Sequence, residues 1–324
     1  MRILVTGGAG YIGSHTCKAL AQAGYEPIVV DNLSRGFEWA VKWGPFEQAD
    51  ISDGARLAEI IEQYKPVAAV HFAAFAYVGE SAEDPLLYYK NNVGGSLSLI
   101  NALQDAGNLP LVFSSTCAVY GIPEVVPIEE TAPFDPVNVY GRTKLMVEEI
   151  LRDCDAYCGM RSVALRYFNA AGADADGEIG EAHDPESHLI PLALAAASRD
   201  GSTLSIFGDD YPTPDGTPIR DYIHVDDLAR AHVAALKYLI EGGTSTALNL
   251  GTGSGYSVLD ILQSVERVTG KPVPAVNAPR RIGDPPSLVA NAQKATKLLG
   301  LSMESSKDID AIIGSAWNWM KKNG

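Results

Sequence analysis

A tyrosine and a lysine four residues apart can act together in proton transfer. Of the 14 tyrosines in this chain, only Tyr140 has a lysine at that distance, Lys144. Positions four apart share one face of a helix, so the phenol and the ammonium become neighbours. A phenol has an ordinary pKa of ~10, and an adjacent cation lowers that pKa. The spacing indicates a general base; the alternative is that Tyr140 packs while Lys144 lies in solvent.

A second group of residues could bind a dinucleotide. Gly7, Gly10 and Gly13 follow a strand-like run at 2–6 and precede a helical pattern. Such a turn lets pyrophosphate approach backbone N–H groups, and the following helix N-terminus carries the negative charge. The alternative is a glycine turn that binds no ligand.

The next strand-like run ends on an acid, Asp31. At that place a carboxylate can accept from both ribose hydroxyls and would repel a 2′-phosphate, which favours NAD over NADP. Arg35 is the one residue that would favour NADP, because its side chain could approach such a phosphate. Asp50 and Ile51 follow a third strand-like segment and either line the adenine or lead into a helix cap.

These residues lie in a chain whose strand-like and helical segments alternate. The strand-like runs are 2–6, 27–30, 67–72, 111–114 and 163–167, with helical patterns near 12–24, 53–64, 85–107 and 140–158. This alternation predicts a Rossmann-type α/β fold, a doubly wound parallel sheet covered on both faces. We expect a dinucleotide domain over 1–170, with a returning segment near 220–250, and a smaller α/β substrate lobe over 171–324. Residues 208–218 and 278–286 are dense in Pro, Gly and Asp and predict long loops.

Composition narrows the class of partner. The 324 residues are 46% hydrophobic and carry a net charge of −15, which argues against nucleic acid or an anionic membrane as partner. An anionic small ligand stays compatible, because local arginines and helix N-termini can bind it. Four cysteines are too few for a disulfide framework and suit a reducing cytoplasm. None has partners spaced for zinc, and we expect no metal, signal peptide or membrane span.

Further motifs connect the chain to a known family. The run 113–121 reads FSSTCAVYG, and 71–74, 78–81, 88–93 and 166–169 read HFAA, VGES, YYKNNV and RYFN. Together with the glycine turn and the Tyr-Lys pair, these make the chain resemble the extended short-chain dehydrogenase/reductase family over nearly its whole length. The runs IFGDDYP at 206–212 and DGTPIRDYIHV at 215–225 are most similar to the branch that epimerises UDP-hexoses at C4.

The resemblance implies a set of site residues. The catalytic residues would be Tyr140, Lys144 and Thr116. Tightly bound NAD would contact Gly7, Gly10, Tyr11, Ile12, Gly13, Asp31, Asn32, Ser34, Arg35, Gly36, Asp50, Ile51, Phe72, Ala73, Ala74, Ala76, Asn91, Ser114, Tyr140, Lys144 and Phe168. A UDP-sugar would contact Thr116, Asn169, His188, Leu189, Phe207, Arg220, Arg281, Asp284 and Leu288. The helices carrying Asn91 and Tyr140 resemble those that form a homodimer bundle in the family.

Departures from the family pattern separate the possible activities. Related dehydratases and decarboxylases carry an acid after the catalytic Ser or Thr, where this chain has Cys117 and Ala118, so we reject dehydration. Ala76 replaces a lysine common near the cofactor, and Leu288 is intermediate in size at the wall facing the C2 substituent. Three alternatives stay open: an epimerase of another UDP-sugar, a dehydrogenase or reductase of the same fold, and a nucleotide-binding protein without turnover.

Overall fold

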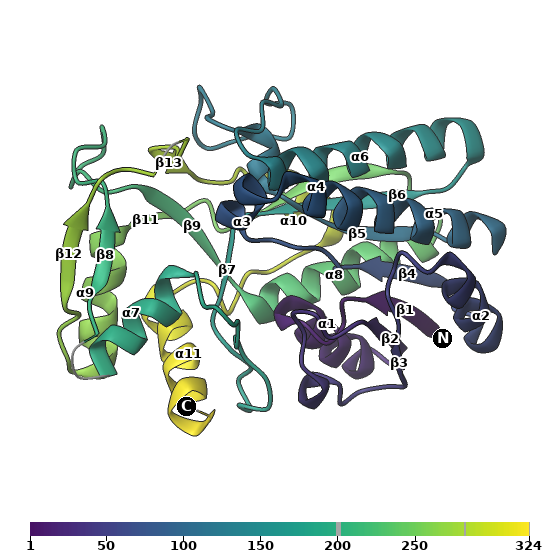
Figure 1. Cartoon of the computed structure of the whole chain (residues 1–324), viewed down its shortest axis with the longest axis horizontal. Helices are drawn as coiled ribbons and strands as arrows, with labels where there is room; N and C mark the ends of the chain where they lie inside the picture. Colours follow the sequence, from purple (N-terminus) through teal and green to yellow (C-terminus); the bar gives the residue numbers. More distant parts are fainter. Residues whose placement is uncertain (199–201, 282, 324) are drawn as a thin grey trace.

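The computed structural model describes residues 1–198, 202–281 and 283–323 (Figure 1). Its centre is a seven-stranded sheet in the order β10-β6-β5-β4-β1-β2-β3, in which every neighbouring pair runs parallel. The strands are β1 (Arg2–Thr6), β2 (Glu26–Asp31), β3 (Phe46–Gln48), β4 (Ala68–His71), β5 (Leu111–Thr116), β6 (Ser162–Tyr167) and β10 (Thr246–Leu250). Strand order reverses between β1 and β4, the place where such sheets form a ligand crevice.

Helices cover both faces of this sheet, which confirms the predicted doubly wound fold. One face packs on α1 (Tyr11–Gln22), α8 (Val225–Ile240) and α10 (Gln293–Leu299). The other packs on α2 (Gly54–Tyr64), α5 (Gly95–Asp105) and α6 (Val139–Cys158). The central strands are buried almost throughout, which explains why they read as continuous apolar runs in the sequence.

A smaller group of elements forms a third apolar cluster beside the sheet. Its helices are α7 (Leu189–Ser198), α9 (Val258–Thr269) and α11 (Ile309–Asn323). Its strands are β7 (Asn169–Ala171), β8 (Leu204–Phe207), β9 (Ile219–His224), β11 (Gly255–Ser257) and β12 (Ala275–Ala278). Strand β13 (Ser287–Leu288) pairs with β9 at its edge. In Figure 1 this group lies to the left of the central sheet, and β7 and β9 lead toward it.

The predicted helical segment near 85–107 is confirmed, because the chain is helical from Pro85 to Asp105. It consists of α4 (Pro85–Tyr88), a π-helical turn at Tyr89–Gly94 and α5, and the short helix α3 (Val78–Glu83) precedes it. In the π turn the Asn92 side chain accepts from the Phe75 backbone N–H at 2.9 Å and donates to the Phe75 carbonyl at 3.0 Å. Such turns often occur at functional sites, and here Asn91 lines a cavity.

In the two predicted loops the described residues form no helix or strand, except that Ala278 is the last residue of β12. Residues 208–218 join β8 to β9, and the described part of 279–286 joins β12 to β13. No helix in the described part of the chain is long and apolar enough to cross a membrane.

Candidate active site

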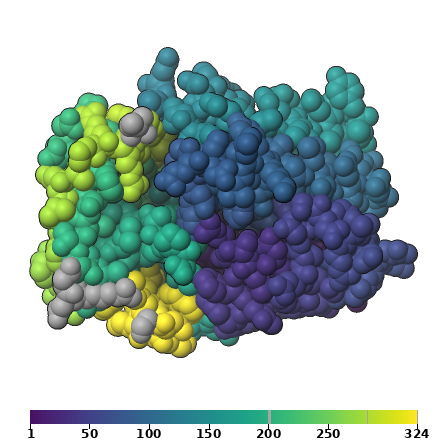
Figure 2. Space-filling model, viewed as in Figure 1, coloured from purple at the N-terminus to yellow at the C-terminus, as the bar shows by residue number. Residues whose placement is uncertain are grey.

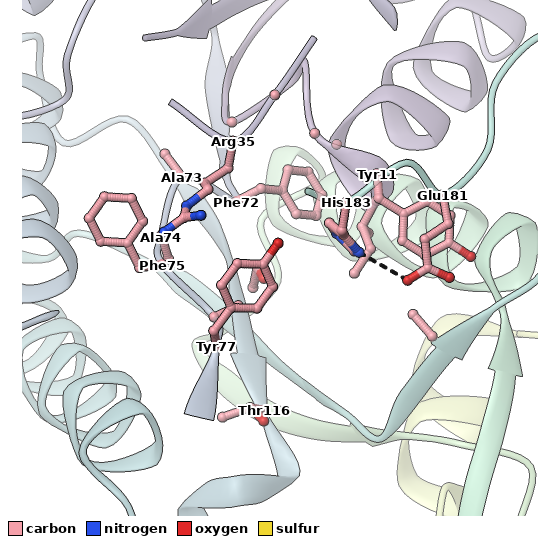
Figure 3. Close-up of a pocket in the computed structure, with 18 of the residues that line it drawn as sticks. Tyr11, Arg35, Phe72, Ala73, Ala74, Phe75, Tyr77, Thr116, Glu181 and His183 are labelled. Carbon is pink, nitrogen blue, oxygen red and sulfur yellow. Dashed lines mark ion pairs between the residues drawn. The ribbon is translucent and has the colours of Figure 1, made fainter. Parts of the chain in front are cut away.

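A cavity opens at the carboxyl ends of the central strands, between the N-terminal part of the chain and the segment after β6 (Figure 2). The end of β1, the end of β2 and the residues after β4 supply one side. The end of β5, helix α6 and the segments 167–171 and 181–191 supply the other. Figure 3 shows several of these side chains around the pocket, among them Tyr11, Tyr77 and Thr116.

The glycine turn between β1 and α1 forms one wall. A Cβ on Gly13 would lie 2.1 Å from the Gly7 carbonyl oxygen, and one on Gly7 would lie 2.5 Å from the Ala73 nitrogen. Only glycine therefore allows these chain segments to touch. A Cβ on Gly10 would meet nothing closer than 3.4 Å, so packing alone does not require glycine there. The open space at Gly10, at the N-terminus of α1, fits an approaching pyrophosphate.

Asp31 ties this turn to the end of β2. Its carboxylate accepts from the backbone N–H of Ala9 at 3.0 Å and of Leu33 at 2.9 Å. Burial raises the pKa of Asp31, and the two N–H donors act in the opposite direction. Arg35, which could have approached a 2′-phosphate, pairs with Glu80 at 2.5 Å and lies over the Tyr77 ring. Its charge is thus already compensated inside the protein.

Helix α6 and strand β5 bring the three proposed catalytic residues to the cavity. Asn138 caps α6 by accepting from the Gly141 N–H at 2.7 Å, which fixes the start of the helix one turn before Lys144. The Lys144 ammonium donates to the Ser114 carbonyl at 2.8 Å and lies 6.0 Å from the centre of the Tyr140 ring. Thr116 ends β5, and its hydroxyl accepts from the Ala118 N–H at 3.1 Å.

Burial is the largest influence on the pKa values of Tyr140 and Lys144. It raises the pKa of Tyr140 above its ordinary value, with a smaller contribution from Tyr167, while the Thr116 hydroxyl lowers it. Burial also lowers the pKa of Lys144 to about 7, against the opposing effect of the Glu148 carboxylate. The predicted lowering of the Tyr140 pKa is therefore not found in the protein chain alone, where burial raises that pKa.

The structure gathers most of the proposed cofactor residues around the cavity, and their roles stay predictions. Asp50 is the exception. Its carboxylate accepts from the Asn32 amide and from the Ser52 backbone, both at 2.8 Å, and it does not line the cavity. Ile51 lines the wall instead, and Asp53 caps α2.

The proposed substrate residues fall into two groups. Thr116, Asn169, His188 and Leu189 line the cavity. The other five lie on β8, on β9 and in the segment that ends in β13, apart from the cavity wall: Phe207, Arg220, Arg281, Asp284 and Leu288. Within this second group the Arg281 guanidinium lies 4.2 Å from the centre of the Phe207 ring, and Arg220 pairs with Asp284. Leu288 packs in a buried cluster with Cys117 and Phe168.

Several cavity residues were missed from the sequence. The most polar are Tyr77, Glu181 and His183. His183 packs edge-on against Tyr11 and Tyr77, with ring centres 6.0 and 6.1 Å apart. The only sequence signal for Glu181 and His183 was the spacing of Glu and His over 181–188, which had no periodicity or neighbouring motif to support it.

This fold and site define a dinucleotide-binding enzyme with a buried tyrosine-lysine pair. Residues 3–251 match the NAD dependent epimerase/dehydratase family, and the chain belongs to that family. It is 54% identical over 321 residues to the UDP-glucose 4-epimerase of Rhizobium leguminosarum bv. trifolii, covering 99% of this chain and 98% of that protein.

Solved structures agree with this assignment. The UDP-glucose 4-epimerase of Brucella ovis in complex with NAD is 55% identical, with a TM-score of 0.95 over 98% of this chain and 97% of that one. The UDP-glucose 4-epimerase of Bifidobacterium longum in complex with NAD+ and UDP is 38% identical, with a TM-score of 0.93 over 100% of this chain and 99% of that one.

Proposed function

We propose that this protein interconverts UDP-glucose and UDP-galactose with bound NAD. The observation that carries the proposal is the buried set of Tyr140, Lys144 and Thr116 beside the glycine turn, in a chain half identical to UDP-glucose 4-epimerases. The family also includes dehydratases, which need an acid next to the catalytic Ser or Thr. Here Cys117 is buried among apolar residues, so this place supplies no proton for a leaving hydroxyl.

The reaction assigns a task to each side chain. NAD, when bound, accepts a hydride from C4 of the sugar and returns it. The Tyr140 oxygen, ionised to the phenolate beside Lys144 and the cationic nicotinamide of bound NAD, would take the proton of the 4-hydroxyl as the ketone forms and give it back on reduction. Thr116 orients that sugar oxygen. Lys144, already held by the Ser114 carbonyl, would donate to the nicotinamide ribose.

Inversion at C4 requires the 4-keto sugar to present its other face before the hydride returns. The uridine diphosphate must therefore stay anchored while the hexose turns. We infer that Arg220, Arg281 and Phe207 help to provide this anchor, because guanidinium groups suit phosphate oxygens and an aromatic ring suits uracil. Binding energy remote from C4 can then hold the nucleotide without fixing the sugar.

A turnover assay without added cofactor tests the function. Purified protein incubated with UDP-galactose should form UDP-glucose, measured by chromatography or NMR, and the reverse reaction should reach the same ratio. NADH should not accumulate, because each cycle regenerates NAD. Steady formation of NADH and an oxidised sugar would instead identify a dehydrogenase, and NAD binding without any conversion would identify a protein that only binds the nucleotide.

We propose in addition that the protein is a cytoplasmic homodimer of galactose metabolism. Helices α4, α5 and α6 expose the large apolar side chains Leu86, Leu97 and Met146, which a second copy could cover. All four cysteines are free, which suits a reducing compartment. Light scattering of the purified protein should give twice the mass of the 34.5 kDa chain, and a monomer mass at micromolar concentration would contradict the dimer.

A further inference from the structure

Two tryptophans that lie far apart in the sequence stack on each other. Trp39 belongs to a short 3-10 turn between β2 and β3, and Trp319 lies near the end of α11. Their ring centres are 5.5 Å apart and their planes meet at 29°, while Phe37 stacks on Trp39 at 5.7 Å and 26°. Figure 2 shows the N-terminal part of the chain, in purple, beside the C-terminal helix, in yellow. The epimerisation described above uses none of these three rings.

The loop that carries Trp39, residues 32–40, also forms part of the cavity wall. Residues 34–36 line the cavity. The Phe37 backbone N–H donates to the Ala9 carbonyl in the glycine turn at 3.0 Å. A Cβ on Gly36 would lie 2.9 Å from the Ala9 carbonyl carbon, so only glycine lets the loop lie this close to the turn. The inner end of loop 32–40 is thus attached to the glycine turn, and its outer end reaches α11 through Trp39.

Trp319 belongs to the opposite side of the cavity and is firmly held there. Its indole N–H donates to the Glu181 backbone carbonyl at 3.1 Å. The ring covers Gly180 so closely that a Cβ at that residue would lie 2.4 Å from it. Helix α11 itself packs in the third apolar cluster. Trp319 is 8% exposed and Trp39 is 43% exposed, so the stack joins a fixed ring to one on a surface loop.

A small hollow beside the stack shows which space the stack closes. Phe37, Trp39 and Gly180 line this hollow together with Gly10 and Tyr11. Gly10 and Tyr11 also line the cavity, so the hollow and the cavity adjoin each other. Gly10 is the residue at which the glycine turn leaves open space for a pyrophosphate. Loop 32–40 and the Gly180 segment therefore face each other across this wall, and the two stacked tryptophans connect them.

A second contact joins the same two parts of the chain more strongly. The Lys18 ammonium on α1 lies 2.8 Å from an oxygen of each of Asp174, Asp176 and Glu178, and Lys18 and Asp174 are buried. Separating buried opposite charges is costly, so this contact stays closed. Segments with few buried contacts open most readily, and Trp39 lies on such a segment. The stack is therefore the contact that breaks first.

We propose that Trp39 and Trp319 are positioning residues that control how fast the cofactor exchanges. While the rings stack, loop 32–40 stays against the opposite wall and keeps bound NAD in the cavity. When the stack breaks, the loop swings away from that wall, and NAD leaves or enters through the opening. Neither ring lines the cavity, so the stack sets the rate of passage and not the strength of binding. The inference rests on the NAD-binding role of the glycine turn and is independent of which sugar is converted.

Exchange of NAD in the intact holoenzyme gives the direct test. The protein with its NAD is incubated with an excess of isotopically labelled NAD, freed of unbound nucleotide at set times, and the bound label is measured by mass spectrometry. Trp39→Ala removes the stack and should exchange about 3- to 30-fold faster than the wild type. Trp39→Phe keeps an aromatic ring and should exchange more slowly than Trp39→Ala. Tyr157→Ala removes an exposed ring on α6 and should exchange like the wild type. Equal rates for Trp39→Ala and the wild type would overturn the proposal.

The dissociation constant for NAD separates control of passage from direct contact. A residue that only opens and closes the path speeds entry and exit equally, so Kd from equilibrium dialysis should differ by less than about threefold between Trp39→Ala and the wild type. A Kd that rises as much as the exchange rate would show that Trp39 stabilises the bound cofactor itself, and the proposal would fail. Neither measurement depends on turnover. Protein that converts UDP-galactose while Trp39→Ala exchanges NAD at the wild-type rate would refute this inference and leave the proposed function standing.

Discussion

Replacing Tyr140 by phenylalanine should lower kcat for UDP-galactose epimerisation by about 10²–10⁴-fold, the usual cost of losing a general acid–base group. Phenylalanine keeps the ring that packs in the cavity and removes only the oxygen that exchanges the proton. The NAD content of the purified variant should stay at the wild-type level, because the glycine turn and Asp31 are unchanged. The measurement is kcat together with NAD released on denaturation.

Helix α6 offers a matched control for this substitution. Tyr157 lies near the other end of the same helix, and its side chain is 87% exposed. Tyr157→Phe should leave both kcat and NAD content unchanged. A Tyr140→Phe variant that kept more than one-tenth of the wild-type kcat would show that another group takes the proton.

The central sheet could be predicted because each of its strands is visible in a short stretch of sequence. Strands such as β1 and β4 are buried on both faces, so nearly every position is apolar and the run is visible in the sequence. The π-helical turn near residue 90 could not be predicted in this way. It depends on hydrogen bonds between Asn92 and Phe75, which are 17 residues apart. Periodicity carries no information on such a contact.

The features of the site that depend on local sequence could also be predicted, and those that depend on the whole fold could not. Gly7 and Gly13 touch neighbouring backbone in a turn of fixed length, so their spacing was readable. The protonation of Tyr140 was not, because burial contributes most and burial depends on the whole fold. The cluster around His183 escaped because isolated Glu and His residues in a loop predict nothing without their folded positions.

The second large expected effect is a loss of stability when the contact between helix α6 and the central sheet is removed. Tyr140, Lys144 and Glu148 follow one another at four-residue intervals and share a face of the helix. Glu148 forms a salt bridge at 2.5 Å with Arg166 of strand β6, and both side chains are at least nine-tenths buried. Arg166 also donates to the Tyr120 hydroxyl at 2.9 Å. The pair therefore joins the catalytic helix to the sheet.

Glu148→Ala should lower the free energy of unfolding by about 3–5 kcal/mol, because it leaves the Arg166 guanidinium buried without its counter-charge. The double variant Glu148→Ala with Arg166→Met removes that charge as well and should recover part of the loss. Denaturant unfolding of all three proteins measures both values. The exposed Glu304, paired with Lys307 on the surface, is the control, and Glu304→Ala should unfold like the wild type. If Glu148→Ala also unfolds like the wild type, the Glu148–Arg166 pair does not hold α6 against the sheet.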